Sequence, residues 1–363
     1  MMNAHRLKIL GVATLLAIVG AFWISNTHDR PKSGDSGQAL YPAIKGKLTS
    51  ATRIRVYRAG DELIADLKRD QDEWRVAERN DYAADGGKVR QLLLDLEQAR
   101  IEEQKTSNAT NYPTLGVADL SDKTATGVRV EVDGLPTPVN LIVGKSDLGA
   151  HTTFVRRAGE APSWLVNVGM EIPSSTGSWL RKDIIDIGAD RIQEAAVAIN
   201  GEPAYSAVKN ARPDANFSVI GLPKGRELNS PSAADSVASA LVGLELTDVK
   251  PAADLSNEKP AARTVFHTFD GLALAVSGWK QNEKFYIAIE PGFDTAIAQR
   301  FHINTAPATE KTPSENPNAQ VEKEAQSLDA KLRPWVFEIA QYKYEALFKP
   351  LEQLLKKKEE KKK

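Results

Sequence analysis

The chain has 363 residues, of which 42% are hydrophobic and 26% are charged, and its formal net charge at pH 7 is −1. This composition is that of an ordinary globular protein long enough for two domains, and it argues against a disordered chain and against a generally basic, nucleic-acid-binding chain. The sequence contains no cysteine, which excludes disulfides, thiolate metal sites, iron–sulfur clusters and a cysteine nucleophile.

An apolar run near the N-terminus predicts a membrane anchor within residues 1–30. The run follows Arg6 and Lys8 and is close to the shortest helix, about 17 residues, that spans a bilayer. Its basic flank predicts a cytoplasmic N-terminus, with everything after Ser25 outside. The alternative is a signal peptide cleaved near Ala21. The anchor positions are Ile9, Leu10, Val12, Leu15, Leu16, Ile18, Val19, Phe22, Trp23 and Ile24.

Residues 53–190 are expected to form a first α+β unit behind a polar linker at 31–52. Alternating apolar side chains over 53–76 predict a three-strand antiparallel meander. Asp85 is the expected cap of a helix over residues 87–98, whose apolar side chains recur at the spacing of one buried stripe. The stripe consists of Val89, Leu92, Leu93 and Leu96.

The rest of the first unit is expected to consist of strands and one helical turn. Asp133-Gly134 is a dipeptide that favours a tight hairpin turn. Residues 182–187 are interpreted as a single helical turn. The expected strands are 128–132, 139–143, 152–156 and 164–168.

Residues 191–303 are expected to form a second α+β unit, because the same elements return in the same order. A meander precedes a helix over Ser232–Leu244, and Asp270-Gly271 repeats the hairpin turn. A short helix is expected within 293–301. The expected strands are 192–199, 203–208, 217–220, 264–269, 272–277 and 284–289. The agreement in order and spacing predicts two tandem similar units.

The C-terminal part is expected to begin with a flexible linker at 304–328, because this stretch is rich in Pro, Glu, Asn and Thr. Residues 329–363 are expected to form a strand after Pro334, an amphipathic helix with an apolar stripe over Leu347–Leu355, and a Lys-rich tail. Pro350 falls inside that stripe and predicts a kink or a break. The sequence leaves open whether the tail is solvated or contacts anionic lipid headgroups.

A series of short motifs resembles a known family. In chain order they are Ile54-Arg55-Val56, Trp74-Arg75-Val76, Tyr112 to Gly116, Leu141-Ile142-Val143-Gly144-Lys145, Phe154-Val155-Arg156, Arg181-Lys182-Asp183 and Trp335-Val336-Phe337-Glu338-Ile339. With the N-terminal anchor, this order resembles the bacterial domain-of-unknown-function family numbered 4340. The resemblance implies a membrane-anchored envelope protein with a repeated domain, similar in context to accessory parts of gliding-type ABC transport systems. It implies no catalytic residues.

The candidate chemical motifs are weak. The five histidines show no pair at ligand spacing, so no metal site is expected. The segment 144–149 fits neither a phosphate-binding loop nor a nucleophile elbow, and it is interpreted as a polar loop. The aspartates at 183, 186 and 190 lack the glycine and closing Glu of a calcium loop. Nothing in the sequence supports a catalytic triad from Ser146, Asp147 and His151. We expect no catalytic, cofactor-binding or metal-binding residues.

The predicted fold class is therefore α+β, with two tandem similar units of antiparallel sheet plus helix behind an N-terminal transmembrane helix. The predicted function is non-enzymatic binding of a protein partner by a single-pass protein of the bacterial inner membrane, with the bulk of the chain in the periplasm, no cofactor and no nucleic acid. Two alternatives stay open. One is a cell-wall glycan-binding module that uses Trp164, Trp179 and Trp279, and the other is an envelope hydrolase that uses carboxylates such as Asp133 or Asp183.

Overall fold

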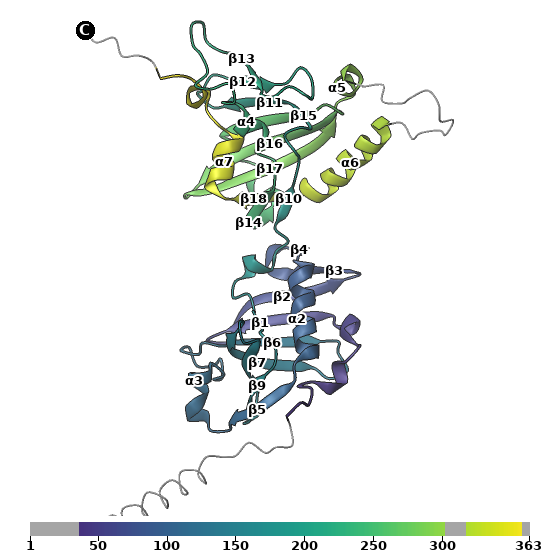
Figure 1. Cartoon of the computed structure of the whole chain (residues 1–363), viewed down its shortest axis with the longest axis vertical. Coiled ribbons are helices and arrows are strands. Elements are labelled where there is room, and N and C mark those ends of the chain that lie inside the picture. The colour runs from purple at the N-terminus through teal and green to yellow at the C-terminus, as the bar shows by residue number, and fades with distance from the viewer. Residues whose placement is uncertain (1–35, 302–316, 358–363) are drawn as a thin grey trace, which may run out of the picture. The chain divides into compact units, whose positions relative to one another are not determined.

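The structure is a computed structural model that describes residues 36–301 and 317–357. The expected anchor, Ile9 to Ile24, lies outside these residues. Within them, no helix is both long enough and apolar enough to cross a membrane. The chain divides into two compact units (Figure 1). The first comprises Met1–Glu78 and Ala83–Trp179, and the second comprises Arg79–Tyr82 and Leu180–Lys363.

The first unit is built on a nine-stranded sheet whose paired strands are antiparallel, in the order β4-β3-β2-β1-β6-β7-β8-β9-β5. Its strands are β1 (Arg53–Arg58), β2 (Glu62–Asp70), β3 (Glu73–Val76), β4 (Tyr82–Ala83), β5 (Ile101–Thr106), β6 (Val128–Asp133), β7 (Val139–Asp147), β8 (Thr152–Arg157) and β9 (Ser163–Val166). Its α-helices are α2 (Gly86–Gln98) and α3 (Tyr112–Leu115).

Helix α2 forms as the sequence predicts and lies across the strands of the first sheet (Figure 1). The side chain of Asp85 caps it by accepting hydrogen bonds from the backbone N–H groups of Gly87 and Lys88. The apolar stripe of the helix is buried, as are Ile54 and Val56 of β1. This side of the sheet therefore holds the main core of the unit, and we call the opposite side its outer face.

Part of the outer face is covered by the segment around α3. Tyr112 and Val117 of this segment pack with Ile142 of β7 into a small buried cluster. Arg156 of β8 fixes the cover, because its guanidinium is buried and donates hydrogen bonds to the carbonyl of Val117 (2.8 Å) and the carboxylate of Asp119 (2.5 Å). The strands β2, β1 and β6 lie beside this covered part.

The second unit is built on another nine-stranded antiparallel sheet, in the order β10-β14-β18-β17-β16-β15-β11-β12-β13. Its strands are β10 (Asp183–Ile185), β11 (Ile192–Ile199), β12 (Tyr205–Val208), β13 (Ser218–Ile220), β14 (Leu244–Pro251), β15 (Ala262–Thr268), β16 (Leu272–Gln281), β17 (Lys284–Phe293) and β18 (Trp335–Ile339). Its α-helices are α4 (Asp235–Ala238), α5 (Thr295–Arg300), α6 (Pro317–Leu332) and α7 (Gln341–Leu347).

The two sheets share one order of strands. The meander β1-β2-β3 corresponds to β11-β12-β13, and the meander β6-β7-β8 corresponds to β15-β16-β17. In each sheet the strand that follows the helix, β5 or β14, pairs beside the last strand, β9 or β18. The Asp-Gly hairpins also agree, because Gly134 and Gly271 adopt positive φ values of 87° and 91°. The α+β class and the antiparallel sheets are as predicted.

Two short elements of the second unit differ from the prediction. The helix expected over Ser232–Leu244 is reduced to α4, because Gly243 turns the chain at φ 52° and Leu244 already begins β14. The helical turn expected at 182–187 is instead strand β10, which pairs with β14. In both places, pairing with the sheet overrides a weak local preference.

Two predictions for the C-terminal part also need correction. Residues 317–328 of the expected linker belong to helix α6, which packs against β16 and β17. Its buried stripe is thin, with Val321, Ala325 and Leu332 among polar neighbours, so a helical period is hard to detect. The single amphipathic helix expected near the C-terminus is α7, which ends at Leu347, and a separate 3-10 turn after Pro350. Pro350 therefore marks a break.

Candidate functional site

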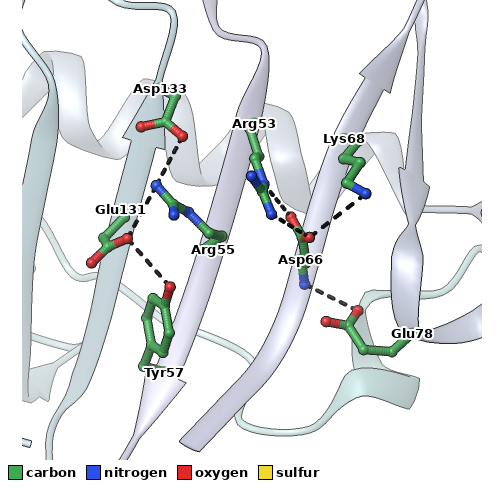
Figure 2. Close-up of polar contacts among 8 residues, drawn as sticks. All are labelled: Arg53, Arg55, Tyr57, Asp66, Lys68, Glu78, Glu131 and Asp133. Carbon is green, nitrogen blue, oxygen red and sulfur yellow. Dashed lines mark hydrogen bonds and ion pairs between the residues drawn. The ribbon is translucent and has the colours of Figure 1, made fainter. Parts of the chain in front are cut away.

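The uncovered part of the first sheet's outer face carries a row of charged side chains (Figure 2). We call this row the charged ladder. It arises because residues of β1, β2 and β6 alternate between the core and the outer face, and the outward positions are occupied by charged or hydroxyl side chains. The ladder consists of Arg53, Arg55, Tyr57, Asp66, Arg129, Glu131 and Asp133.

Arg53 and Asp66 form a two-pronged pair across β1 and β2 (Figure 2). The guanidinium donates from Nε to one carboxylate oxygen at 2.7 Å and from Nη2 to the other at 2.8 Å. The Asp66 side chain is only 8% exposed, and its backbone N–H donates to the Glu78 carboxylate. The hydrogen bonds from Arg53 lower the pKa of Asp66 below its ordinary value, so this carboxylate stays charged.

Glu131 is the centre of the other half of the ladder. Its carboxylate lies 3.2 Å from Arg55 and 3.3 Å from Arg129, and it accepts a hydrogen bond from the Tyr57 hydroxyl at 3.4 Å. Arg55 also donates to Asp133 at 2.9 Å, and the Arg129 guanidinium stacks 4.4 Å from the centre of the Tyr57 ring. The Nε atoms of Arg55 and Arg129 are buried, and neither has a hydrogen-bond partner among the described atoms. Two donors of this network therefore make no hydrogen bond within the described part of the chain.

These contacts define what the ladder is able to do. Opposite charges face each other across neighbouring strands, so the pairs stabilise the sheet and keep the face hydrated. Two pockets lie elsewhere, one beside Tyr41 and Arg157 and one on the second unit. In the described part of the chain, no group of three His, Asp or Glu side chains is placed to hold a metal ion. The ladder is thus suited to contact with another polar surface.

A second polar cluster lies on the second sheet. His267 of β15 stands opposite Glu194 of β11, with Nδ1 3.6 Å from its carboxylate, and its Nε2 lies 3.8 Å from the carboxylate of Asp294. Asp294 is at the same time the N-terminal cap of α5. The sequence gives no direct signal for this cluster, because its three members come from distant segments that only the strand register brings together.

The segment around Ser146 does not assemble a triad, and it is only partly the polar loop that the sequence predicts, because residues 144–147 belong to strand β7. The Ser146 hydroxyl shares a hydrogen bond of 2.9 Å with Thr153, and Asp147 accepts one from the backbone N–H of Ala150. His151 is exposed and adopts a positive φ of 53°. Ser146 and Asp147 therefore hold the end of β7 and the turn that follows it, whereas the His151 side chain faces solvent.

The aspartates proposed for hydrolysis or calcium binding are accounted for by local structure. Asp133 belongs to the charged ladder through Arg55, whereas Asp183 is exposed on β10. Asp186 accepts a hydrogen bond from the backbone N–H of Gly243 at 2.8 Å. These contacts place the three carboxylates in separate structural roles.

The tryptophans of the glycan-binding alternative are mostly buried. Trp164 is 4% exposed and Trp179 is fully buried, because both contribute to the core of the first unit. Trp279 is half-buried and donates its Nε1–H to the carbonyl of Glu258. Trp74 is also half-buried. The structure therefore offers no exposed row of these rings.

The fold and the ladder together define an α+β protein of two nine-stranded antiparallel sheets with a charged outer face on one of them. The chain belongs to the family described as "Domain of unknown function (DUF4340)", whose match covers residues 74–262, more than half of the chain. The match extends from β3 into β15 and so includes parts of both units. No curated protein and no solved structure matches the chain.

Proposed function

We propose that this protein is a single-pass protein of the bacterial inner membrane, whose two sheet units lie in the periplasm and bind a protein partner as an accessory of an ABC-type transport or gliding-type complex. The observation that carries the proposal is the charged ladder. It is a charged surface of side chains paired across neighbouring strands, and such surfaces recognise other proteins more readily than small molecules.

The chemistry of the ladder defines the kind of partner. Arg55 bridges Glu131 and Asp133, and both carboxylates of this group keep oxygen lone pairs that a cationic side chain is able to approach. A partner with alternating basic and acidic groups therefore fits the ladder, and its binding weakens as salt is added.

The N-terminal apolar run and the start of the fold support the membrane location. The backbone of Gly37 and Gln38 already pairs with Ile101 at the edge of the first sheet. Only about a dozen residues separate this point from the end of the run at Ile24. A segment of that length spans at most about 40 Å even when it is fully extended, so the first unit stays close to the bilayer.

A photocrosslinking experiment in intact cells tests the partner. A photoreactive amino acid at Tyr57 is expected to capture an inner-membrane or periplasmic transport protein, whereas the same group at Tyr342, which is 68% exposed on the second unit, is the matched control. Adding Asp133→Lys is expected to remove the Tyr57 product, because it inverts one charge of the ladder. Identical products from both positions, or products unaffected by Asp133→Lys, contradict this surface.

The membrane location is tested separately. The mass of the purified protein is expected to include the complete apolar run, and protease added to spheroplasts is expected to degrade the two units. A mature protein that begins near Ala21 indicates a cleaved signal peptide instead. Protection of the units from external protease contradicts the proposed orientation.

A further inference from the structure

The strand β13 ends the second sheet without a neighbour, unlike its counterpart in the first sheet. In the first sheet β3 is followed outward by β4, and the backbone N–H of Ala84 donates to the carbonyl of Trp74 at 2.7 Å. In the second sheet, no strand of the described chain lies beyond β13. A position that is filled in one sheet is therefore open in the other.

A shallow apolar groove of about 380 Å³ lies beside this edge. Its floor is made of small outward side chains on neighbouring strands, and Ile220 of β13 lines it while being 61% exposed. Leu222, two residues further, is 37% exposed. The lining residues are Ala196, Val197, Ala198, Ala204, Tyr205, Ser206, Ile220, Gly221, Arg263 and Val265. The exposed Ile220 side chain therefore lies next to an apolar groove, and the two together form an apolar patch that another chain is able to cover.

The edge also lacks most of the devices that usually keep sheet edges apart. β13 (Ser-Val-Ile) is short, which is one such device, but it carries no charged side chain, proline or bulge. The opposite edge of the same sheet differs, since β10 carries Asp183 and the Lys331 ammonium donates to the carbonyl of Ile184. The open edge at β13 is therefore the one suited to accept a strand.

We propose that β13 pairs in antiparallel fashion with β13 of a second copy of this chain, about a two-fold axis at Val219. In this register Ser218 of each copy lies directly opposite Ile220 of the other. Ser218 and Ile220 are both outward, because they pair with Val208 and Ser206 of β12. The small hydroxyl side chain leaves room for the partner's isoleucine, which closes over the outer face beside the groove.

The charges that flank β13 agree with an antiparallel arrangement. Asp214 precedes the strand and Lys224 follows it, so the N-terminal end of one copy meets the C-terminal end of the other with opposite charge. The other two basic residues near the strand are already engaged. Arg212 stacks on the ring of Phe269, and Arg226 forms a two-pronged pair with Glu352. Lys224 has no ion-pair partner among the described residues and is exposed.

A single engineered cysteine tests the pairing, because the natural chain contains none. Directly opposed residues of antiparallel strands have Cα atoms about 4.5–5.5 Å apart, a separation that a disulfide bridges. Membranes from cells that produce the full chain with Val219→Cys, oxidised with copper phenanthroline, are expected to yield a disulfide-linked dimer of this chain. Val242→Cys, also in the second unit and 40% exposed, is the matched control and is expected to stay monomeric.

A second substitution in the same protein separates edge pairing from random collision. Ile220→Lys added to Val219→Cys is expected to abolish the linked dimer, whereas Ile220→Val is expected to retain it. Since Ile220 is mostly exposed, both variants are expected to keep the unfolding midpoint of the parent. The proposal is overturned if Val219→Cys links no more than Val242→Cys, if it links to a different protein, or if the lysine leaves the product unchanged. These outcomes do not depend on the partner proposed for the charged ladder.

Discussion

The outer faces of the two sheets differ, although the strands that form them correspond. In the first sheet, β2, β1 and β6 present the charged ladder, in which Arg55 contacts both Glu131 and Asp133. In the second sheet, the corresponding strands β12, β11 and β15 present a patch of small apolar side chains, among them Ala196 and Val265, which stand directly opposite each other. This patch lies between polar residues such as Glu194, His267 and Arg263. The same strand order therefore supports two different surfaces.

The difference teaches that the core positions and the outer positions carry separate information. Inward residues such as Ile54 and Ala195 are fully buried in both sheets, because each sheet needs one apolar side against its helices. Outward residues are free to differ, but charged and apolar side chains have different structural consequences. Charges have to be paired across strands, whereas apolar side chains leave a groove that another strand is able to cover.

The largest effect is expected at the covered part of the first outer face. Arg156→Met is expected to lower the free energy of unfolding by about 3 kcal/mol. The substitution removes the buried guanidinium, so the carbonyls of Val117 and Glu160 lose their hydrogen-bond donors. Urea unfolding of the full chain measures this loss. Arg156→Lys is expected to recover little, since an ammonium does not reproduce the fork. A cost below that of an ordinary surface substitution contradicts the role of Arg156 in holding the cover.

The next effect is expected within the charged ladder. Asp66→Asn is expected to lower the free energy of unfolding by about 2 kcal/mol at neutral pH, because Arg53 loses a two-pronged charged partner. The lowered pKa of Asp66 means that its contribution is complete above the pKa of the unfolded chain and disappears as the pH falls through the folded pKa. Unfolding curves of both proteins are therefore expected to converge in acid. A constant difference across pH contradicts an electrostatic origin.

A buried carboxylate on helix α2 contrasts with Asp66, because no cationic side chain of the described residues pairs with it. Asp95 is 6% exposed and accepts a hydrogen bond from the Gln91 amide, and burial raises its pKa. A raised pKa makes the wild-type protein gain stability as the pH falls, which is the opposite sign to Asp66. Asp95→Asn keeps the acceptor and is expected to raise the free energy of unfolding by about 1 kcal/mol at neutral pH. Hydrogen exchange of the α2 amides measures this change in stability. If Asp95→Asn destabilises the protein at pH 7, the carboxylate is not an unfavourable buried charge.

Much of the fold follows from the sequence, for reasons that particular residues make clear. The helix capped by Asp85 and the hairpins at Gly134 and Gly271 are local features, so their signals lie within a few residues. By contrast, β10 forms only because β14 lies beside it. The few apolar residues of α6 are recognisable as a buried stripe only when the sheet against which they pack is known. Such elements depend on distant segments.

The candidate site is less predictable than the fold. The sequence places Arg55 on a strand and Asp133 in a hairpin turn, but the two are 78 positions apart and only the register of β1 with β6 makes them partners. The cluster of Glu194, His267 and Asp294 depends on register in the same way. Conversely, Trp179 follows a run of Ser, Thr and Gly, and its burial becomes evident only once the core is assembled.

The smallest effect is expected on the apolar face of the second sheet. Ala196→Arg introduces a ladder-like charge at a position flanked by Ser206 and Val265, where the long side chain is able to lie along the apolar floor and reach water. We expect the free energy of unfolding to change by no more than about 0.5 kcal/mol, as for other surface positions. Urea unfolding measures the change, and Ala195→Arg, on the buried side of the same strand, is the matched control that is expected to prevent folding. If Ala196→Arg is as damaging as Ala195→Arg, the face is a second core instead of an open surface, and the contrast between the two sheets fails.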